Sequence, residues 1–224
     1  MKLALFDVDG TLVDSRAMIT ASLAAAFTAE GLAVPEESRM LSIVGLSLVD
    51  AMKALAPAEA LATHERLADA YKQAFWENRA SGRHMEHLFH GALELLTTLH
   101  AREDVLLGIA TGKSRRGVDH LIERLGFQGW FTTIQTSDHH PSKPHPSMVV
   151  TALAETGLEP SAAIMIGDTS YDITMARAAG VGAAGVAWGN HSVTELVQAG
   201  AQTISNNFNE LEKHLEALWQ EKAR

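Results

Sequence analysis

Two carboxylates one residue apart follow the first apolar run of the chain, in Leu3-Ala-Leu-Phe-Asp7-Val-Asp9-Gly10. Residues i and i+2 of a strand share one face, so Asp7 and Asp9 project the same way if the strand continues to Asp9. Like charges at such range stay ionised only beside a cation, or else one carboxyl keeps its proton. Because Asp-Gly is also ordinary turn sequence, a solvated turn is the alternative interpretation.

Three further predicted strands, over 105–111, 132–136 and 163–167, lead into polar residues suited to phosphoryl transfer. In open parallel sheets, ligands bind outside the carboxyl ends of the strands, so these residues are predicted to meet Asp7 there. The residues in question are Thr111, Gly112, Lys143, Asp168 and Asp172.

A phosphate monoester is anionic, so a carboxylate attacks it only where positive charge offsets both reactants. We assign that charge to Mg²⁺ held by oxygens of Asp7 and Asp168. Asp7 is the predicted nucleophile, which forms an aspartyl-phosphate, and Asp9 the general acid that later activates water. Asp172, one helical turn beyond Asp168, is predicted to hold a metal-bound water or Lys143. The predicted phosphate-binding residues of the sheet edge are Gly10, Thr111, Gly112 and Lys143.

The elements that position these residues fall into two blocks. Between residues 16 and 86 the pattern predicts helices alone, whereas from residue 91 onward strands and helices alternate. Alternation of this kind indicates a parallel sheet with helices on both faces. We therefore predict an α/β core formed by residues 1–14 and 88–224, with an all-helical cap, residues 15–87, inserted after the first strand.

Composition narrows the function further. The chain has 224 residues, no cysteine and a formal net charge of −9, which argues against a nucleic-acid or anionic-membrane binder with a basic surface. It begins with strand-like sequence instead of a signal peptide, and no apolar run approaches the roughly 18 residues of a membrane span. We expect a cytoplasmic protein, monomeric or homodimeric, that acts on a small phosphorylated metabolite and has no nucleic-acid or membrane partner.

Four segments, in this order, resemble the motifs of the haloacid dehalogenase superfamily of phosphatases. They are Asp7-Val-Asp9-Gly10-Thr11, Ile109-Ala-Thr111-Gly112, Lys143-Pro-His-Pro146 and Gly167-Asp168-Thr-Ser-Tyr-Asp172. The resemblance covers the whole chain and implies a modified Rossmann-like core with the inserted cap. It also implies Mg²⁺ ligands, namely the Asp7 carboxylate, the Asp9 backbone carbonyl and Asp168. The chain is most similar to the phosphoglycolate phosphatase-like branch, and the acid at Asp9, which dehalogenating members lack, disfavours dehalogenation.

Gly45 lies where caps of this family carry a loop that reaches into the core site. A glycine permits close backbone approach to a ligand, so Gly45 is predicted to contact the substrate. Around it stand Val44, Leu46 and Leu48, where β-phosphoglucomutase-like relatives place cationic side chains. This difference disfavours a sugar-phosphate mutase.

Two alternatives to a small-metabolite phosphatase stay open. One is a phosphomutase of the β-phosphoglucomutase-like type, which keeps the phosphoryl group on Asp7 long enough to return it to the substrate. The other is a non-catalytic, phospho-accepting binding protein similar to a receiver domain. The helical insert and the Gly-Asp-x-x-x-Asp sequence of residues 167–172 count against the second alternative.

Histidines and a basic turn give weaker signals. His84, His87 and His90 recur every third residue, but without a neighbouring carboxylate or cysteine this spacing is poor evidence for a metal site. The turn Lys113-Ser-Arg-Arg116 is interpreted equally well as a solvated basic turn or as an anion-gathering helix start. The remaining histidines near a predicted site residue, Lys143, are His139, His140 and His145.

Overall fold

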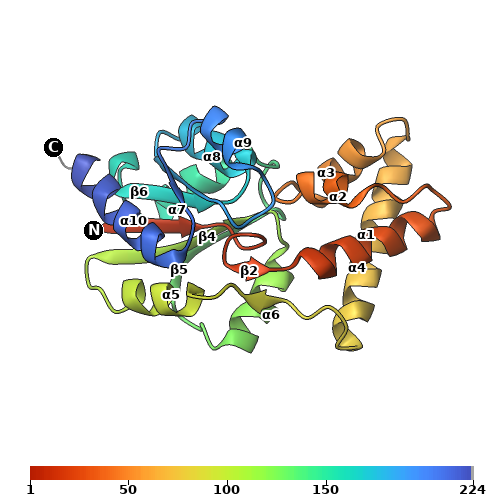
Figure 1. Cartoon of the computed structure of the whole chain (residues 1–224), viewed down its shortest axis with the longest axis horizontal. Helices are drawn as coiled ribbons and strands as arrows, with labels where there is room; N and C mark the ends of the chain where they lie inside the picture. Colours follow the sequence, from red (N-terminus) through yellow and green to blue (C-terminus); the bar gives the residue numbers. More distant parts are fainter. Residues whose placement is uncertain (223–224) are drawn as a thin grey trace.

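The computed structural model describes residues 1–222 and contains a six-stranded sheet whose neighbouring strands all pair in parallel. Its strands are β1 (Lys2–Phe6), β4 (Val105–Thr111), β5 (Phe131–Thr136), β6 (Ala163–Gly167), β7 (Gly182–Val186) and β8 (Thr203–Ser205). They lie in the order β5-β4-β1-β6-β7-β8, so the first strand of the chain is central (Figure 1). The predicted α/β fold class is confirmed.

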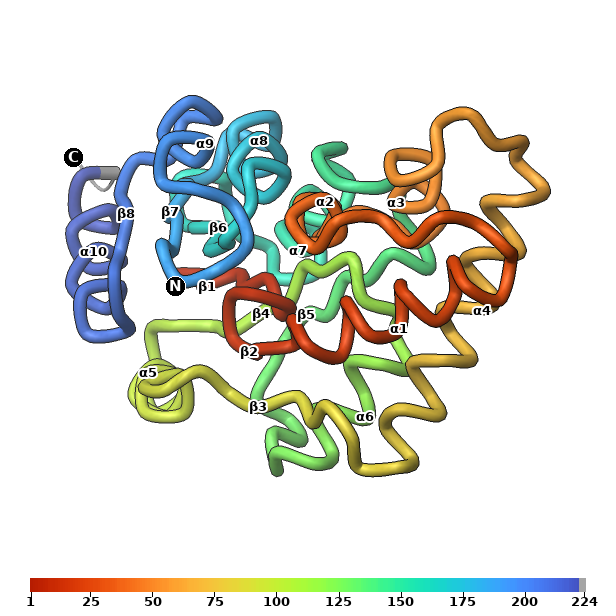
Figure 2. Tube along the Cα trace, turned by 45° about the vertical axis from the view of Figure 1, so that its right-hand side comes forward, coloured from red at the N-terminus to blue at the C-terminus, as the bar shows by residue number. Residues whose placement is uncertain are grey.

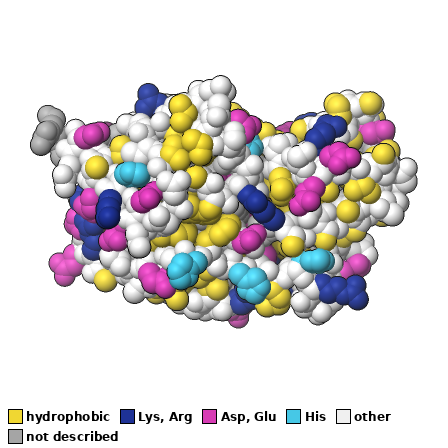
Figure 3. All heavy atoms as spheres, viewed as in Figure 1, with side chains coloured by type: hydrophobic (Ala, Val, Ile, Leu, Met, Phe, Trp, Pro, Cys, Tyr) yellow, Lys and Arg dark blue, Asp and Glu magenta, His cyan; other side chains and the backbone are white. Residues whose placement is uncertain are grey.

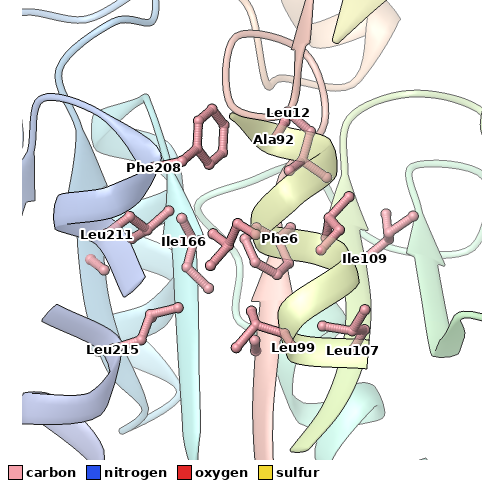
Figure 4. Close-up of a cluster of buried hydrophobic side chains, with 14 of the residues drawn as sticks. Phe6, Leu12, Ala92, Leu99, Leu107, Ile109, Ile166, Phe208, Leu211 and Leu215 are labelled. Atoms are coloured by element: carbon pink, nitrogen blue, oxygen red, sulfur yellow. The ribbon is translucent and has the colours of Figure 1, made fainter. Parts of the chain in front are cut away.

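Helices cover both faces of the sheet because the apolar residues of β1 alternate between two cores. Ala4 and Phe6 belong to a core completed by α5, α6 and α10, and Figure 4 shows Phe6 between α5 and α10. Leu3 and Leu5 belong to the opposite core, completed by α7, α8 and α9. The helices are α5 (Ala92–His100), α6 (Arg115–Leu125), α7 (Ser147–Thr156), α8 (Ser170–Ala178), α9 (Val193–Gln198) and α10 (Phe208–Lys222), with a short 3-10 turn over Pro160–Ala162.

The helical block after the first strand has a buried cluster of its own. It consists of α1 (Arg16–Ala29), α2 (Glu37–Ser42), α3 (Leu48–Leu55) and α4 (Leu61–Ala80). Leu23 and Phe27 of α1 pack in this cluster with Leu67 of α4, and the two helices lie side by side (Figures 1 and 2). The block projects from the carboxyl end of the sheet, on the right of both views.

A two-stranded antiparallel ribbon joins the block to the sheet. It pairs β2 (Val13–Asp14) with β3 (His87–Leu88), where the sequence had indicated no strand. The backbone N–H groups of Thr11, Leu12 and Val13 all donate to the Val8 carbonyl, so the chain turns directly after β1. The strand thus ends at Phe6, so the condition for a shared face of Asp7 and Asp9, a strand that continues to Asp9, is not met.

The surface carries charges of both signs. On the face shown in Figure 3, Lys and Arg side chains are scattered among Asp and Glu instead of forming a continuous basic area. No helix within residues 1–222 has both the length and the apolar character that crossing a bilayer requires.

Candidate active site

The carboxyl ends of four strands bring the predicted site residues together. Phe6, the last residue of β1, pairs with Ile109 of β4 and with Ile166 of β6, so the residues that follow these strands emerge at one edge. The residues that the structure gathers there are Asp7, Asp9, Gly10, Thr111, Gly112, Lys143, Asp168 and Asp172. As the sequence predicted, each comes from a strand end or from the loop that follows one, except Asp172, which lies in the first turn of α8.

Lys143 connects two of the buried carboxylates. Its Nζ donates to Asp7 Oδ1 at 2.7 Å and to Asp172 Oδ1 at 2.6 Å. Asp7 and Lys143 are each 1% exposed. Burial opposes the positive charge of Lys143, but Asp172 and Asp7 outweigh it and raise the pKa of the lysine. Lys143 therefore stays charged beside the proposed nucleophile.

A third carboxylate, that of Asp168, lies beside the two that bind Lys143. Oxygens of Asp7, Asp168 and Asp172 lie within 4.8 Å of one another, and all three residues are buried. Burial, together with Asp172 and Asp168, raises the pKa of Asp7 to about 8 in spite of Lys143. Burial and Asp172 raise the pKa of Asp168 to about 6, although hydrogen bonds from Asn190 and Thr11 act in the opposite direction. The cluster thus holds more negative charge than its cation balances.

The donor set fits a divalent metal ion. Asp7 Oδ2 is buried and has no hydrogen-bond partner among the described residues, which is a costly arrangement unless a cation satisfies that oxygen. Carboxylate oxygens are the ligands that Mg²⁺ prefers. Both carboxylate oxygens of Asp172 already have hydrogen-bond partners. Its Oδ1 accepts from Lys143, and its Oδ2 accepts from Thr169 N and Oγ1 at 3.1 and 2.7 Å. Asp7 is therefore better placed than Asp172 to offer an oxygen.

Asp168 is oriented by residues that the sequence analysis did not identify. Its Oδ1 accepts from Thr11 Oγ1 at 2.9 Å, and its Oδ2 accepts from Asn190 N and Nδ2 at 2.7 and 2.9 Å. Asn190 follows β7, a fifth parallel strand end, so the same rule applied to that strand would have found it. At Gly10, where φ is +93°, a Cβ would overlap Asp168 Oδ2 and Asn190 Nδ2, so only glycine fits there.

Asp9 faces a different lysine. Lys113 Nζ donates to both of its oxygens, at 2.8 and 3.1 Å. The same Nζ lies 2.9 Å from Glu86 Oε1. The solvated-turn interpretation does not hold for Lys113, whose side chain is 8% exposed and pairs with two carboxylates, whereas the anion-gathering interpretation of this helix start stays a prediction. Thr111 Oγ1 accepts from Lys113 N at 3.2 Å and so helps to hold the turn.

The turn around Gly45 lies against the core loops. At Gly45, φ is +99°, and a Cβ there would press on Thr169 Oγ1 at 3.3 Å. A Cβ on Gly112 would lie 2.6 Å from the Gly45 carbonyl oxygen, so a glycine on each side permits this approach. Ser47 N donates to Ser142 Oγ at 2.7 Å and fixes the contact.

A cleft of about 750 Å³ lies between the helical block and the sheet edge. Asp7, Asp9 and Thr111 lie on its core side. Its other wall is mostly apolar and includes Val44, Leu46, Leu48, Tyr71 and Phe75. This volume is within the usual range for a small-molecule site.

One histidine near Lys143 hydrogen-bonds to neighbouring side chains. His140, which lines the cleft, hydrogen-bonds to Gln135 Oε1 at 2.9 Å and to Ser147 Oγ at 2.8 Å. Burial and the neighbouring His139 lower the pKa of His140. Among residues 1–222, the one group of acidic or histidine side chains close enough to share a metal ion is the aspartate cluster, so His84, His87 and His90 do not form such a site.

The fold and the carboxylate cluster at its strand ends define a hydrolase that works on a small ligand at the sheet edge. The chain belongs to the haloacid dehalogenase-like hydrolases, whose family model matches residues 4–186. It is similar to the probable phosphatase IndB of Dickeya dadantii, with 33% identity over 93% of this chain and 91% of that protein. It is also similar to the N-acetylmuramic acid 6-phosphate phosphatase of Pseudomonas aeruginosa, with 29% identity over 94% and 93% of the two chains.

Solved structures of similar fold are also hydrolases and predicted phosphatases. A predicted phosphatase from Clostridium acetobutylicum matches with a TM-score of 0.86 and 27% identity, covering 96% of this chain and 98% of that chain. A hydrolase from Pseudomonas syringae matches with a TM-score of 0.85 and 26% identity over 97% and 99% of the two chains. The resemblance noted in the sequence is thus confirmed, and the protein is a phosphatase of this family.

Proposed function

We propose that the protein is a Mg²⁺-dependent phosphomonoester hydrolase that works through an aspartyl-phosphate on Asp7. One observation carries the proposal. Asp7 is buried directly after the central strand, beside Asp168 and Asp172. One of its oxygens accepts from Lys143, and the other has no hydrogen-bond partner within residues 1–222. A carboxylate held in this way is oriented for in-line attack and lacks only a cation at its free oxygen.

The Asp7 and Asp168 carboxylates and the Asp9 backbone carbonyl would hold the metal ion. When bound, Mg²⁺ offsets the negative charges of the nucleophile and of the phosphate. Thr11 and Asn190 hold Asp168 in place for this task.

The chain's own residues carry the two half-reactions. In the first, an Asp7 oxygen bonds to phosphorus while the bond to the leaving oxygen breaks, and Asp9 donates a proton to that oxygen. In the second, Asp9 takes a proton from water as the water attacks the aspartyl-phosphate, which releases inorganic phosphate and restores Asp7. Lys143 supplies a fixed positive charge at Asp7, and the Thr111 hydroxyl hydrogen-bonds a phosphoryl oxygen.

Residues 15–87 act as the cap over this site, and residues 1–14 and 88–224 as the catalytic core. The cap contributes the apolar wall of the cleft and the Gly45 turn, while the phosphate lies among Gly10, Thr111, Gly112 and Lys143. The relatives are named for N-acetylmuramic acid 6-phosphate, pyrophosphate and phosphoglycolate. A small phosphorylated metabolite in the cytoplasm is the corresponding substrate class, hydrolysed by a monomer or homodimer.

Phosphate release from a panel of phosphomonoesters, with Mg²⁺ present, tests the proposal. Release should stop with EDTA and in Asp7→Asn, whereas Asp69→Asn, at an exposed position of α4, should retain it. Asp9→Asn should lose turnover but keep Mg²⁺ binding, because only its backbone carbonyl is a proposed ligand. Phosphate transfer within a sugar phosphate would instead indicate a mutase. Stable labelling of Asp7 by acetyl phosphate, with no release from any ester, would indicate a receiver-like protein.

A further inference from the structure

One buried carboxylate near the site has no part in the proposed reaction. Glu86 is 4% exposed and directly precedes β3, where the chain returns from α4 to the sheet. A glutamate is seldom buried so fully unless its charge is paired. The partners of Glu86 therefore indicate what it does.

Glu86 joins three separate parts of the molecule. Its Oε1 accepts from Lys113 Nζ, in the turn after β4, at 2.9 Å. Its Oε2 accepts from Arg79 Nη2, in the last turn of α4, at 2.7 Å. Its backbone carbonyl accepts from Arg124 Nη2, on α6, at 2.8 Å. The helical block, the core turn and a core helix are thus held at one residue.

Lys113 uses its full donor capacity in this arrangement. An ammonium has three N–H donors, and the acceptors around Nζ are Asp9 Oδ1, Asp9 Oδ2 and Glu86 Oε1. The long lysine stem is flexible, so a single carboxylate would leave it several rotamers. Glu86, as a second carboxylate partner of Nζ, removes that freedom.

The charges of the group balance. When the Asp9 carboxyl is ionised, the two cations Lys113 and Arg79 face the two carboxylates of Asp9 and Glu86. The ring of Phe75, on α4, lies close to both cations, with its centroid 5.3 Å from Lys113 Nζ and 5.0 Å from the Arg79 guanidinium. These charged side chains are largely shielded from solvent, with exposed fractions of 8% for Lys113, 3% for Glu86 and 16% for Arg79. Removal of one member leaves one charge of the group uncompensated.

We propose that Glu86 is a positioning residue, which holds Lys113 against Asp9 and, through Arg79, links the orientation of Asp9 to the placement of α4. This inference rests on the proposed function, in which Asp9 is the general acid and base. Asp9 must present its carboxyl to the leaving oxygen and then to water, so loss of its fixed orientation slows turnover more than it weakens substrate binding.

A double-mutant cycle on Glu86 and Lys113 tests the first half of the proposal. Glu86→Gln should lower kcat about 10- to 100-fold and change KM less than about 3-fold, because a misplaced group costs transition-state stabilisation and not uniform binding. In a Lys113→Met background the same substitution should change kcat less than about 2-fold, since Glu86 acts through Lys113. An equal loss in both backgrounds, or an unchanged kcat in Glu86→Gln, overturns the proposal.

Arginines of α4 test the second half. Arg79→Gln should lower kcat without a matching change in KM. Arg66→Gln is the matched control, because Arg66 lies on the same helix and pairs with Glu30, the residue after α1, at 2.8 Å and outside the cleft. The control should keep the activity of the wild type. Equal kcat in Arg79→Gln and Arg66→Gln would remove α4 from the proposal.

Thermal unfolding of each variant shows whether a loss of activity is a loss of folding. If Glu86→Gln does not fold, Glu86→Asp, which keeps the negative charge, takes its place. Glu86→Asp should retain more kcat than Lys113→Met, and a smaller kcat than that of Lys113→Met overturns the proposal. A wild-type protein inactive on every phosphate ester overturns the proposed function itself. An active wild type with kcat unaltered by substitution of Glu86 overturns this inference alone.

Discussion

The carboxylates of Asp7 and Asp9, one residue apart in the chain, are held by different lysines. Lys143 lies 2.7 Å from Asp7 Oδ1, and Lys113 lies 2.8 Å from Asp9 Oδ1. The chain turns after Val8, so the two side chains leave the strand end toward different loops. Repulsion within the pair is reduced because each carboxylate has its own cation, and the two can perform different chemical tasks.

Replacement of Lys143 should abolish activity and destabilise the fold. Lys143→Met leaves Asp7 and Asp172 buried without a cation, and breaking a buried pair in this way costs about 3–5 kcal/mol of unfolding free energy. Activity should fall at least about 100-fold, since the fixed charge at the proposed nucleophile is lost. Urea unfolding and phosphate release provide the measurements. Lys53→Met, which removes an exposed pair with Asp50, should cost less than about 1 kcal/mol. Wild-type activity in Lys143→Met would contradict the assignment.

Asn190 should affect metal affinity more than stability. Its Nδ2 donates to Asp168 Oδ2 at 2.9 Å, and loss of a residue that orients a metal ligand costs about 10- to 100-fold in affinity or activity. Asn190→Ala should therefore raise the Mg²⁺ concentration needed for half-maximal activity. Asn206→Ala, at an exposed site where the amide bonds Glu210, is the control. The same Mg²⁺ requirement in both variants would show that Asn190 does not orient the ligand.

Metal-free protein should lose stability as the pH rises. The pKa of Asp7 is raised from its ordinary 3.8 to about 8, and that of Asp168 from 3.8 to about 6. Between pH 3.8 and about pH 8, the folded state therefore binds more protons than the unfolded state. Stability contributed by these protons is lost on titration upward through that interval. With EDTA, Tm should fall from pH 5 to pH 8 less steeply in Asp168→Asn than in the wild type, and Mg²⁺ should restore the wild-type Tm at pH 8. A steeper fall in the variant would contradict the sign.

Glu86 should have the opposite pH dependence, in a more acidic range. Burial alone would raise its pKa, but Lys113 and Arg79 lower it from 4.5 to about 2. Its contribution to stability is present above pH 4.5 and is lost as the pH falls through about 2. The difference in unfolding free energy between wild type and Glu86→Gln should therefore shrink from pH 5 to pH 2. The variant Glu103→Gln, at an exposed position, should show no such change. A difference that grows in acid would refute the pairing.

The fold was predictable because its signals are local. Apolar runs such as 105–111 and 163–167, separated by amphipathic helices, identify strands and indicate that the strands run parallel, without knowledge of distant contacts. The β2–β3 ribbon was not predictable in this way. Each of its strands has two residues, too few to show alternation, and the pairing of Val13 with Leu88 depends on the intervening helices.

In the candidate site, too, the residues that follow strands were predictable and those held by distant contacts were not. Asp7, Lys143 and Asp168 follow strands, so topology alone predicts that they meet. Lys113 and Glu86 could not be assigned, because Lys113 reaches a partner 104 residues away and another 27 residues away. Such contacts depend on how α4 and the core loops pack, which no residue pattern in the chain encodes directly. The roles of these residues in the reaction stay predictions.

The β2–β3 ribbon also has a consequence for how the chain folds. β1 must pair with β4 across the whole helical block before the central sheet exists, and a long loop carries a large closure entropy. Once Val13 has paired with Leu88, the chain left to close between Phe6 and Val105 is about a quarter as long, which lowers that entropic cost by about 1.2 kcal/mol. Formation of the ribbon thus makes the pairing of β1 with β4 entropically less costly.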